Sequence, residues 1–524
     1  MKWWTYLGVL ALAVLLLDLA WLGRLERGGV PHVRIDLAGE VPATLYVPRP
    51  ASGEIPPFGL PEPPPPGERP PVVVVVHGFS EDRAMMSPFA RSLAEAGYAA
   101  LAIDVRGHGE NRNGLARGMG SDAALVADVG EAVDFLRTSP YVDGSRIALA
   151  GHSMGAGAIL SYGGRDSGID GVLLISGGWR LAGPHDPPNV LFLYAEGDFG
   201  PMKARLATLA GKLAGGQVLA PGVTVGEPAK GTGVRLVEIA DTDHVGIIFS
   251  DDTIAECVAW LDAIYGTPRD VPARLVDARM GAVLVGLLAF LVLLPGLGVV
   301  IGRFAPHVIK ASGSRVFQRL GLFFAALVLT LPLVAVEGTA EFLPLAIADS
   351  VLLHFAYAGS AVLAWLALSG GLALVAKTGR TGLAVAAAAL GFAVFYALLA
   401  PLGAASHRMA LTPERTLVAF FAALLLFPFC LASGLLLRRG STWVATLTSL
   451  GGHVIVVAVL VIGVLVQIMP GILFLMIPIF AVLLLAFEIV ATGIYAASRN
   501  ITTIALLESL FIAWVFSAVM PILA

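Results

Sequence analysis

The chain has 524 residues, of which 57% are hydrophobic and 14% are charged, against about 25% charged in an ordinary soluble domain, so much of it must face lipid. Its formal net charge of −4 is small for this length, and the polar part carries no basic stripe, which excludes nucleic acid as an expected partner. The two cysteines, Cys257 and Cys430, stand in different parts of the chain and form neither a disulfide framework nor a four-ligand metal site, so we expect no metal and no other cofactor.

The first predicted element is an apolar run over residues 3–23, long enough to cross a bilayer core at about 1.5 Å per residue. The run ends around Asp18 and Trp21, without the small residues that usually precede a signal-peptide cleavage site. We therefore expect residues 1–24 to be a retained transmembrane anchor, with a removed signal peptide as the alternative.

Residues 25–275 hold most of the acids and turn residues and are predicted to form an aqueous domain. Two short β-patterned runs over 33–48 predict an antiparallel hairpin, and the proline-rich stretch 61–67 predicts an extended spacer loop. Continuously apolar strands then alternate with helices, a pattern typical of a parallel sheet covered on both faces. The expected strands are 72–76, 99–104, 147–150, 172–175, 190–194 and 234–239, and the expected helices are 86–97, 121–138, one after Ser153, 201–215 and 252–264.

The pentapeptide Gly151–Gly155 reads Gly-His-Ser-Met-Gly and joins the predicted strand 147–150 to a helical pattern. This is the context that a G-x-S-x-G nucleophile elbow requires. A serine on such a sharp turn takes a strained backbone conformation, and the glycines on either side let the neighbouring chains approach. The pattern therefore predicts that Ser153 is a nucleophile.

Other motifs follow four more of the predicted strands: His-Gly-Phe-Ser at 77–80, Asp-Val-Arg-Gly-His-Gly-Glu-Asn at 104–111, Glu-Gly-Asp at 196–198 and Asp-Thr-Asp-His-Val-Gly at 241–246. Together with the pentapeptide they resemble the α/β-hydrolase superfamily of serine esterases and lipases, especially its monoglyceride-lipase-like and serine-aminopeptidase-like branches. The resemblance covers about residues 33–265. It implies an α/β-hydrolase domain with a mostly parallel sheet, helices on both faces and a minimal cap.

The resemblance also implies a catalytic triad in the chain order Ser153, Asp198, His244. His244 would take the proton of Ser153, Asp198 would orient the imidazole, and water would hydrolyse the acyl-enzyme. Glu196 is the competitor for the acid, because a carboxylate at either place could hold the imidazole.

The same resemblance places an oxyanion hole between two loops, formed by the backbone N–H groups of Phe79 and Met154. His77 and His152 are the other histidines of these motifs. Both lie at positions that the family uses for structure, so we do not expect either of them to be the base. The motif 104–111 is expected to form a turn without a catalytic role.

Many lipases insert a helical cap between two late strands, whereas here the connection 176–189 has only about fourteen residues. No cap domain fits in that length. The site is therefore expected to be open, or to have its missing wall supplied by the membrane domain or the bilayer surface.

Residues 276–524 are predicted to be a membrane domain of about eight transmembrane helices. The apolar runs are 280–301, 320–336, 351–376, 382–404, 416–437, 444–468, 471–496 and 501–523. All-α architecture is the expected fold of this part.

The charged residues between the spans predict an orientation. If the N-terminus is cytoplasmic, every inner segment is basic and free of acids, which satisfies the positive-inside rule. We therefore expect a multi-pass protein of the plasma (inner) membrane whose hydrolase domain is extracytoplasmic. The inner basic residues are Lys2, Arg303, Lys310, Arg315, Arg319, Lys377, Arg380, Arg438, Arg439 and Arg499, and the short outer loops hold Glu337, Glu341, Asp349 and Glu414 beside Arg408 and Arg415.

Polar residues within spans are costly, which makes them candidates for function. His453, Glu488 and Glu508 fall at a similar predicted depth and form one candidate intramembrane cluster, with separate helix-packing hydrogen bonds as the alternative. Asp18 and His354 fall in the opposite leaflet, where a pair between them is a further hypothesis.

Three functions remain open from the sequence. The first is a membrane-bound serine hydrolase of the carboxylesterase or lipase type that acts on an acyl ester or lipid in contact with the lipid bilayer. The second is a serine peptidase or acyltransferase with the same triad. The third is a transporter or channel whose hydrolase-like domain binds without catalysis.

Overall fold

The computed structural model describes residues 2–50, 59–116, 120–178, 181, 185–308, 315–336, 342–369 and 381–524. These residues divide into two compact units, here called the sheet unit and the helical unit. The sheet unit consists of Trp21–Ala282, Gly403–Arg408 and Pro521–Ala524, and the helical unit consists of Met1–Ala20, Val283–Leu402 and Met409–Met520. The sequence pattern did not indicate that the short segments 403–408 and 521–524 belong with the sheet unit. The predicted domain limits, 1–24, 25–275 and 276–524, stay predictions.

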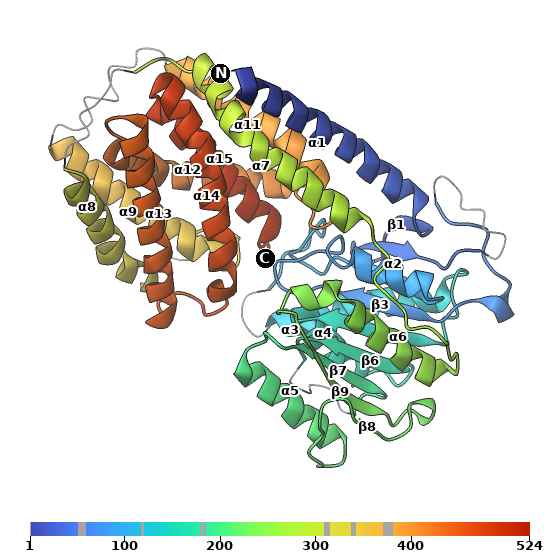
Figure 1. Ribbon diagram of the computed structural model, residues 1–524. Coiled ribbons are helices and arrows are strands. Elements are labelled where there is room, and N and C mark those ends of the chain that lie inside the picture. Colours follow the sequence, from blue (N-terminus) through green and yellow to red (C-terminus); the bar gives the residue numbers. More distant parts are fainter. Residues whose placement is uncertain are drawn as a thin grey trace. The chain divides into compact units, whose positions relative to one another are not determined.

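Within the described residues, nine strands form one sheet in the order β1-β2-β4-β3-β5-β6-β7-β9-β8 (Figure 1). The strands from β4 to β9 in this order run parallel, whereas β1 and β2 form the predicted antiparallel hairpin and β8 pairs antiparallel with β9. The predicted α/β fold is confirmed, and β8 is the one strand that the pattern did not predict. The strands are β1 (His32–Asp36), β2 (Pro42–Tyr46), β3 (Val72–Val76), β4 (Ala99–Ile103), β5 (Ile147–His152), β6 (Gly171–Ile175), β7 (Val190–Ala195), β8 (Thr224–Val225) and β9 (Val234–Ile239).

Helices cover both faces of the sheet (Figure 1). One face packs against α3 (Gly120–Thr138), α4 (Met154–Gly163) and α5 (Gly200–Leu213), and the other against α2 (Ser87–Glu95) and α6 (Asp251–Tyr265). Strand β3 explains the continuously apolar sequence of the central strands. Its valines alternate between the two cores, so each face of the strand is buried.

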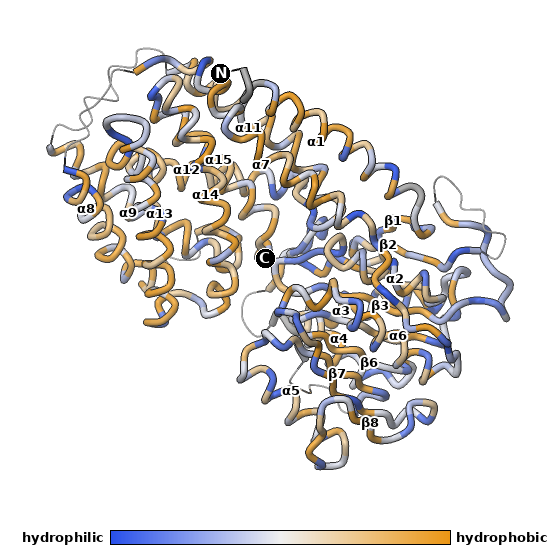
Figure 2. Tube along the Cα trace, viewed as in Figure 1, coloured by the Kyte–Doolittle hydropathy of each residue, from blue (hydrophilic) through white to orange (hydrophobic). Residues whose placement is uncertain are grey.

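Nine helices in the described part of the chain are long and apolar enough to cross a membrane. Figure 2 shows the hydrophobic colour running along them, whereas the sheet unit is mixed. Each predicted apolar run overlaps one of these helices, and this composition indicates a membrane protein, while the predicted orientation stays a prediction. The helices are α1 (Lys2–Gly28), α7 (Arg279–Phe304), α8 (Val316–Thr330), α9 (Ala348–Leu368), α11 (Thr381–Gly403), α12 (Pro413–Leu437), α13 (Thr442–Leu465), α14 (Leu473–Ser498) and α15 (Ile501–Val519).

Several predicted runs end earlier as α-helices than expected, and two of them end at or near a proline. α8 gives way after Thr330 to a short 3₁₀ helix, Leu331–Ala335, which has a proline in its first turn. α15 ends at Val519 because Pro521 restricts the residue before it and has no N–H to donate. Parts of other predictions lie outside the described residues, namely the end of the run 351–376, five residues of the connection 176–189, and Lys310, Glu337, Glu341, Lys377 and Arg380.

Candidate active site

The parallel strands bring the sequence motifs to one edge of the sheet unit. β3, β5, β7 and β9 run in the same direction, so their carboxyl ends meet at that edge. The motifs at 77–80, 151–155, 196–198 and 241–246 lie at or directly follow these ends. Residues spread over 170 positions of the chain are thereby placed in one region, which is where open α/β sheets bind their ligands.

Ser153 sits on the sharp turn between β5 and α4, with φ 50° and ψ −110°. A side chain on the flanking glycines would collide with backbone, since a Cβ on Gly155 would lie 2.5 Å from the His77 carbonyl oxygen and a Cβ on Gly151 2.7 Å from the carbonyl carbon of Gly155. Gly177, in the β6–β7 connection, approaches from a third side, where a Cβ would lie 2.2 Å from the Ser153 carbonyl oxygen. The strained turn is therefore held by three close backbone approaches that require glycine.

The structure brings Ser153, His244 and Asp198 together in a hydrogen-bonded row. The Nε2 atom of His244 lies 3.0 Å from Ser153 Oγ, and its Nδ1 atom lies 2.7 Å from Asp198 Oδ1. The other Asp198 oxygen accepts hydrogen bonds from Ser176 Oγ at 2.6 Å and from the Ala195 N–H at 2.9 Å. Burial alone would raise the pKa of Asp198, but these hydrogen bonds outweigh it and hold the pKa below its usual range. Asp198 is thus an ionised acceptor that favours a proton on His244 Nδ1 and leaves Nε2 free to accept from the serine hydroxyl.

The competing acid, Glu196, lies elsewhere. Its side chain is exposed, and its Oε2 atom accepts a hydrogen bond from the backbone N–H of Asp241 at 3.1 Å. The structure therefore places Asp198, and not Glu196, against the imidazole of His244.

The two residues expected to form the oxyanion hole lie at neighbouring loops. Phe79 follows β3, and Met154 is the first residue of α4. The two loops are in close contact, because a Cβ on Gly78 would lie 2.9 Å from the ring of His152. Among the described residues, neither the Phe79 N–H nor the Met154 N–H donates a hydrogen bond within the protein. These two donors are thus available to a ligand atom.

His77 and His152 have other partners than the serine hydroxyl. The Val105 N–H donates to His77 Nε2 at 3.2 Å, so the Nδ1 atom carries the ring proton and donates to the Gly78 carbonyl at 2.8 Å. The Nε2 atom of His152 donates to the backbone carbonyl of His244 at 2.7 Å. Both rings therefore connect backbone segments, in agreement with the structural interpretation of their motifs.

Sequence reasoning missed two residues that order these loops. Ser176 directly follows β6 and donates to Asp198, and its signal is a serine just after the carboxyl end of the strand beside β5. Glu81 lies in the loop after β3 and accepts a 2.6 Å hydrogen bond from the Gly78 N–H. No local pattern marks Glu81, because its partners are set by the packing of that loop.

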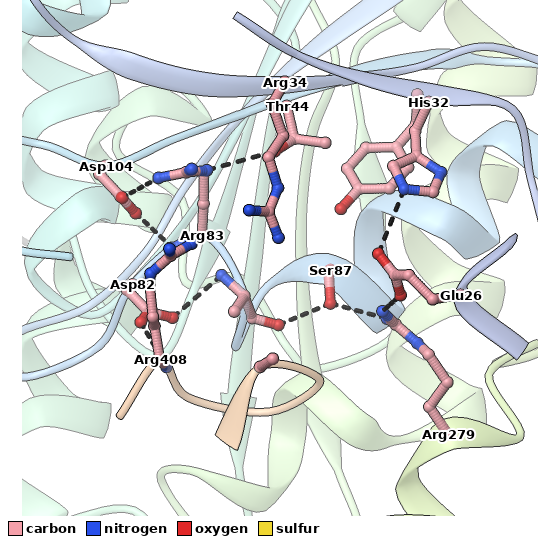
Figure 3. A pocket seen from close by; sticks show the side chains of 13 residues that line it. Glu26, His32, Arg34, Thr44, Asp82, Arg83, Ser87, Asp104, Arg279 and Arg408 are labelled. Atoms are coloured by element: carbon pink, nitrogen blue, oxygen red, sulfur yellow. Dashed lines mark hydrogen bonds and ion pairs between the residues drawn. The ribbon is translucent and has the colours of Figure 1, made fainter. Parts of the chain in front are cut away.

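A polar pocket of the sheet unit lies beside the same loop (Figure 3). Arg83 spans it, pairing with Asp104 and with Glu110, and Arg408 also contacts Glu110 at 2.6 Å. Asp104 belongs to the motif expected to form a turn, and it accepts the backbone N–H of Arg83 at 2.7 Å. The pocket is thus lined by charges of both signs, namely Arg34, Arg83, Arg279 and Arg408 with Glu26, Asp82 and Asp104.

The helical unit brings the predicted intramembrane residues close to one another. His453 Nε2 lies 3.9 Å from a Glu488 oxygen, and Glu508 lines the same pocket as His453. The principal partner of Glu488 was not predicted: Arg438, counted in the sequence as a basic loop residue, forms a bidentate pair with it at 2.9 and 2.5 Å. Within the described residues the hypothetical pair of Asp18 and His354 does not form, since neither His354 ring nitrogen has a hydrogen-bond partner.

Sheet order, helices on both faces and motifs at the carboxyl ends of the strands together define the α/β-hydrolase fold. Residues 67–213 match a family model described as serine aminopeptidase, S33. The resemblance of the sheet unit to the α/β-hydrolase superfamily is therefore confirmed.

Individual proteins with similar sequences match shorter stretches. A monoacylglycerol lipase from Mycolicibacterium smegmatis is 30% identical over 151 residues, which are 28% of this chain and 46% of the lipase. An uncharacterised 31.7 kDa protein from Escherichia coli is 29% identical over 117 residues, covering 20% of this chain and 40% of that protein. A solved dienelactone hydrolase from Anabaena variabilis covers 46% of this chain and all of its own, with 16% identity and a TM-score of 0.32. The chain spans less than half the length of these two curated relatives.

Proposed function

We propose that the protein is a membrane-bound serine hydrolase that cleaves carboxylic esters of acyl or lipid substrates. Ser153 is the nucleophile, His244 the general base and acid, and Asp198 the residue that orients the imidazole. The observation that carries the proposal is the position of His244, with one ring nitrogen on Ser153 Oγ and the other on the Asp198 carboxylate.

The reaction follows from these contacts. His244 accepts the hydroxyl proton as Ser153 Oγ attacks the ester carbonyl, and the Asp198 carboxylate stabilises the imidazolium that forms. The negative charge on the carbonyl oxygen is stabilised by the N–H groups of Phe79 and Met154. The imidazolium then protonates the leaving alcohol, and a water molecule activated by His244 releases the acid from the acyl-enzyme.

The similarity to a monoacylglycerol lipase supports an acyl glycerol or related lipid as the substrate class. The apolar helices of the chain support a location in a membrane, where such substrates are concentrated. The distribution of basic residues between the spans supports a sheet unit outside the cytoplasm.

Labelling of native membranes with a fluorophosphonate probe tests the nucleophile. We expect the wild-type chain to be labelled and Ser153→Ala to be unlabelled, and the same variant should lose nearly all turnover of a p-nitrophenyl ester. Labelling that persists in Ser153→Ala would remove Ser153 from the reaction.

The location can be tested on the same membranes. Val218 is fully exposed and both native cysteines are buried, so Val218→Cys provides a single accessible thiol. We expect a membrane-impermeant maleimide to label this variant in intact cells. Labelling only after the cells are broken would place the sheet unit in the cytoplasm.

A serine peptidase is the second candidate, because the matching family model is that of a serine aminopeptidase. The same triad cleaves esters and amides, so the substrate decides between the two. We expect turnover of a monoacylglycerol to exceed that of an aminoacyl p-nitroanilide in kcat/KM, and the reverse order would favour the peptidase.

A further inference from the structure

The segment Gly403–Arg408 begins at the last residue of α11 and continues into its connection with α12. It belongs to the sheet unit and packs on the loop that follows β3. His407 makes two of the contacts with this loop. Its Nδ1 atom lies 3.1 Å from Asp82 Oδ2, and its Nε2 atom lies 3.0 Å from the Ser80 carbonyl oxygen. Its side chain is only 19% exposed, and that of Asp82 is 2% exposed.

Both partners of the ring accept hydrogen bonds and neither donates one. A neutral imidazole has a single N–H and can satisfy only one of them, whereas the imidazolium donates to both. Burial lowers the pKa of His407, but the Asp82 carboxylate, the Ser80 carbonyl and the nearby Glu81 carboxylate outweigh that effect and raise it. The contacts therefore select the charged form of the ring.

Asp82 is itself fixed by hydrogen bonds to both of its carboxylate oxygens. Its Oδ1 atom accepts hydrogen bonds from the Ala84 and Met85 N–H groups at 2.9 and 3.1 Å, and its Oδ2 atom accepts the Arg408 N–H at 2.7 Å. Figure 3 shows Asp82 facing Arg408 across the edge of the polar pocket. The carboxylate thus joins the segment 403–408 to the beginning of the turn that leads into α2.

The carbonyl that His407 holds belongs to Ser80, the residue after the one that carries the proposed oxyanion donor. Ser80 has a left-handed backbone, with φ 60°, and follows Phe79 directly. The Ser80 carbonyl is in the Ser80–Glu81 peptide and the Phe79 N–H is in the Gly78–Phe79 peptide, with one peptide plane between them. A shift of the Ser80 carbonyl therefore reaches the Phe79 N–H through the Cα atoms of Ser80 and Phe79. A donor displaced by about 1 Å can lower a rate by as much as 10²-fold.

We propose that His407 is a positioning residue of the hydrolase site, whose imidazolium holds the loop 78–82 so that the Phe79 N–H points at the oxyanion. This inference rests on the proposed function of Ser153. A residue in the connection between the apolar helices α11 and α12 thereby contributes to the proposed hydrolysis in the sheet unit.

The test compares three variants of the full-length chain in detergent micelles by the second-order rate of Ser153 labelling with a fluorophosphonate probe. His407→Gln can donate to one acceptor only and turns its oxygen toward the other. We expect it to lower the rate by about tenfold to a hundredfold. His407→Lys keeps a positive donor and should recover most of the loss.

Arg408→Gln is the matched control, because it removes a side-chain contact of the same segment, the pair with Glu110, in which both partners are 27% exposed. We expect its rate to stay within about twofold of wild type. With a p-nitrophenyl ester, His407→Gln should lower kcat and leave KM almost unchanged, since the oxyanion contact forms only in the transition state.

Equal labelling rates in His407→Gln and wild type would overturn the inference, and so would equal losses in His407→Gln and Arg408→Gln. If His407→Gln elutes as an aggregate, the folded His407→Lys variant decides, because a rate near wild type supports the proposal and a rate at least tenfold lower contradicts it. The same labelling experiment distinguishes a failure of this inference from a failure of the proposed function. If wild type is not labelled at Ser153, both proposals fall, whereas labelling that depends on Ser153 but not on His407 removes this inference alone.

Discussion

The ring of His152 joins Glu81 to the loop that carries His244. Its Nδ1 atom lies 2.8 Å from Glu81 Oε1, an ion pair rather than a well-aligned hydrogen bond, and its Nε2 atom donates to the His244 carbonyl. Glu81 in turn accepts the Gly78 N–H. The loops after β3, β5 and β9 are thus connected through one buried imidazole.

This connection predicts a pH-dependent stability. Burial lowers the pKa of His152, but Glu81 and the His244 carbonyl outweigh it and raise the pKa above its ordinary value of about 6.5. The contribution of the charged ring is therefore fully present below about pH 6.5 and is lost as the pH rises through the folded-state pKa. We expect the difference in Tm between wild type and His152→Gln to be largest near pH 6 and to shrink toward pH 9.

Thermal unfolding of the purified full-length chain at a series of pH values checks this expectation. His185→Gln is the control, because its side chain is exposed, and it should show no pH-dependent difference from wild type. A difference for His152→Gln that grows with pH would mean that the ring is neutral in the folded protein.

The close approach of Gly155 to the backbone after β3 leads to a prediction for which Gly157 on the same helix provides the control. A Cβ on Gly155 would lie 2.5 and 2.6 Å from the carbonyl oxygens of His77 and Val76, which are backbone atoms and cannot turn aside. Gly155→Ala should therefore cost roughly 1–3 kcal/mol of stability and slow fluorophosphonate labelling by displacing Ser153. Gly157→Ala, on the same helix with nothing within 4 Å of its Cβ, should stabilise the chain by about 0.5–1 kcal/mol. Equal effects of the two substitutions on labelling would show that this contact does not hold the turn.

Much of the sheet unit could be predicted because its signals are local. Apolar runs such as 72–76 mark strands buried on both faces, and Gly151–Gly155 marks the turn after one of them. The resemblance of the motifs to the α/β-hydrolase superfamily then implies Asp198 and His244 as the acid and the base. The catalytic roles of these residues stay predictions, although their side chains lie together.

The residues that the sequence did not reveal are those whose partners come from distant segments. Nothing around His407 indicates that it contacts Asp82, because the two lie more than 300 positions apart and the loop between two apolar runs has no strand or helix periodicity. In the sequence Arg438 reads as a basic residue that flanks a span, whereas its guanidinium pairs with Glu488 on α14. Charge patterns predict orientation, and they carry no information on which side chains meet.

The choice between two carboxylates can be tested directly. Asp198 contacts His244, whereas Glu196 contacts the backbone of Asp241. Asp198→Asn would favour the wrong imidazole tautomer and should lower kcat by roughly 10⁴-fold, and Glu196→Gln should leave kcat within about twofold. Ester turnover of the two purified variants checks the assignment. A larger loss in Glu196→Gln would reverse the two roles.

The helical unit offers a prediction that is independent of catalysis. Arg438 and Glu488 are 3% and 4% exposed and form a bidentate pair, and Glu488 also accepts hydrogen bonds from Ser449 at 2.8 Å and Thr492 at 3.1 Å. Arg438→Met would leave the carboxylate buried with only the two hydroxyl donors. We expect it to lower the free energy of unfolding by roughly 3–5 kcal/mol.

Removing the second charge should reverse most of this loss. The double variant Arg438→Met/Glu488→Gln no longer buries an unpaired charge, so we expect it to unfold at a higher temperature than Arg438→Met alone. Arg439→Met is the matched control, because within the described part of the chain the guanidinium of this neighbouring arginine donates to one group, the carbonyl of Leu435 at 2.8 Å, and its loss should change the Tm little. Thermal unfolding in detergent micelles measures all three. A double variant no more stable than Arg438→Met would mean that the arginine acts by packing and not by neutralising Glu488.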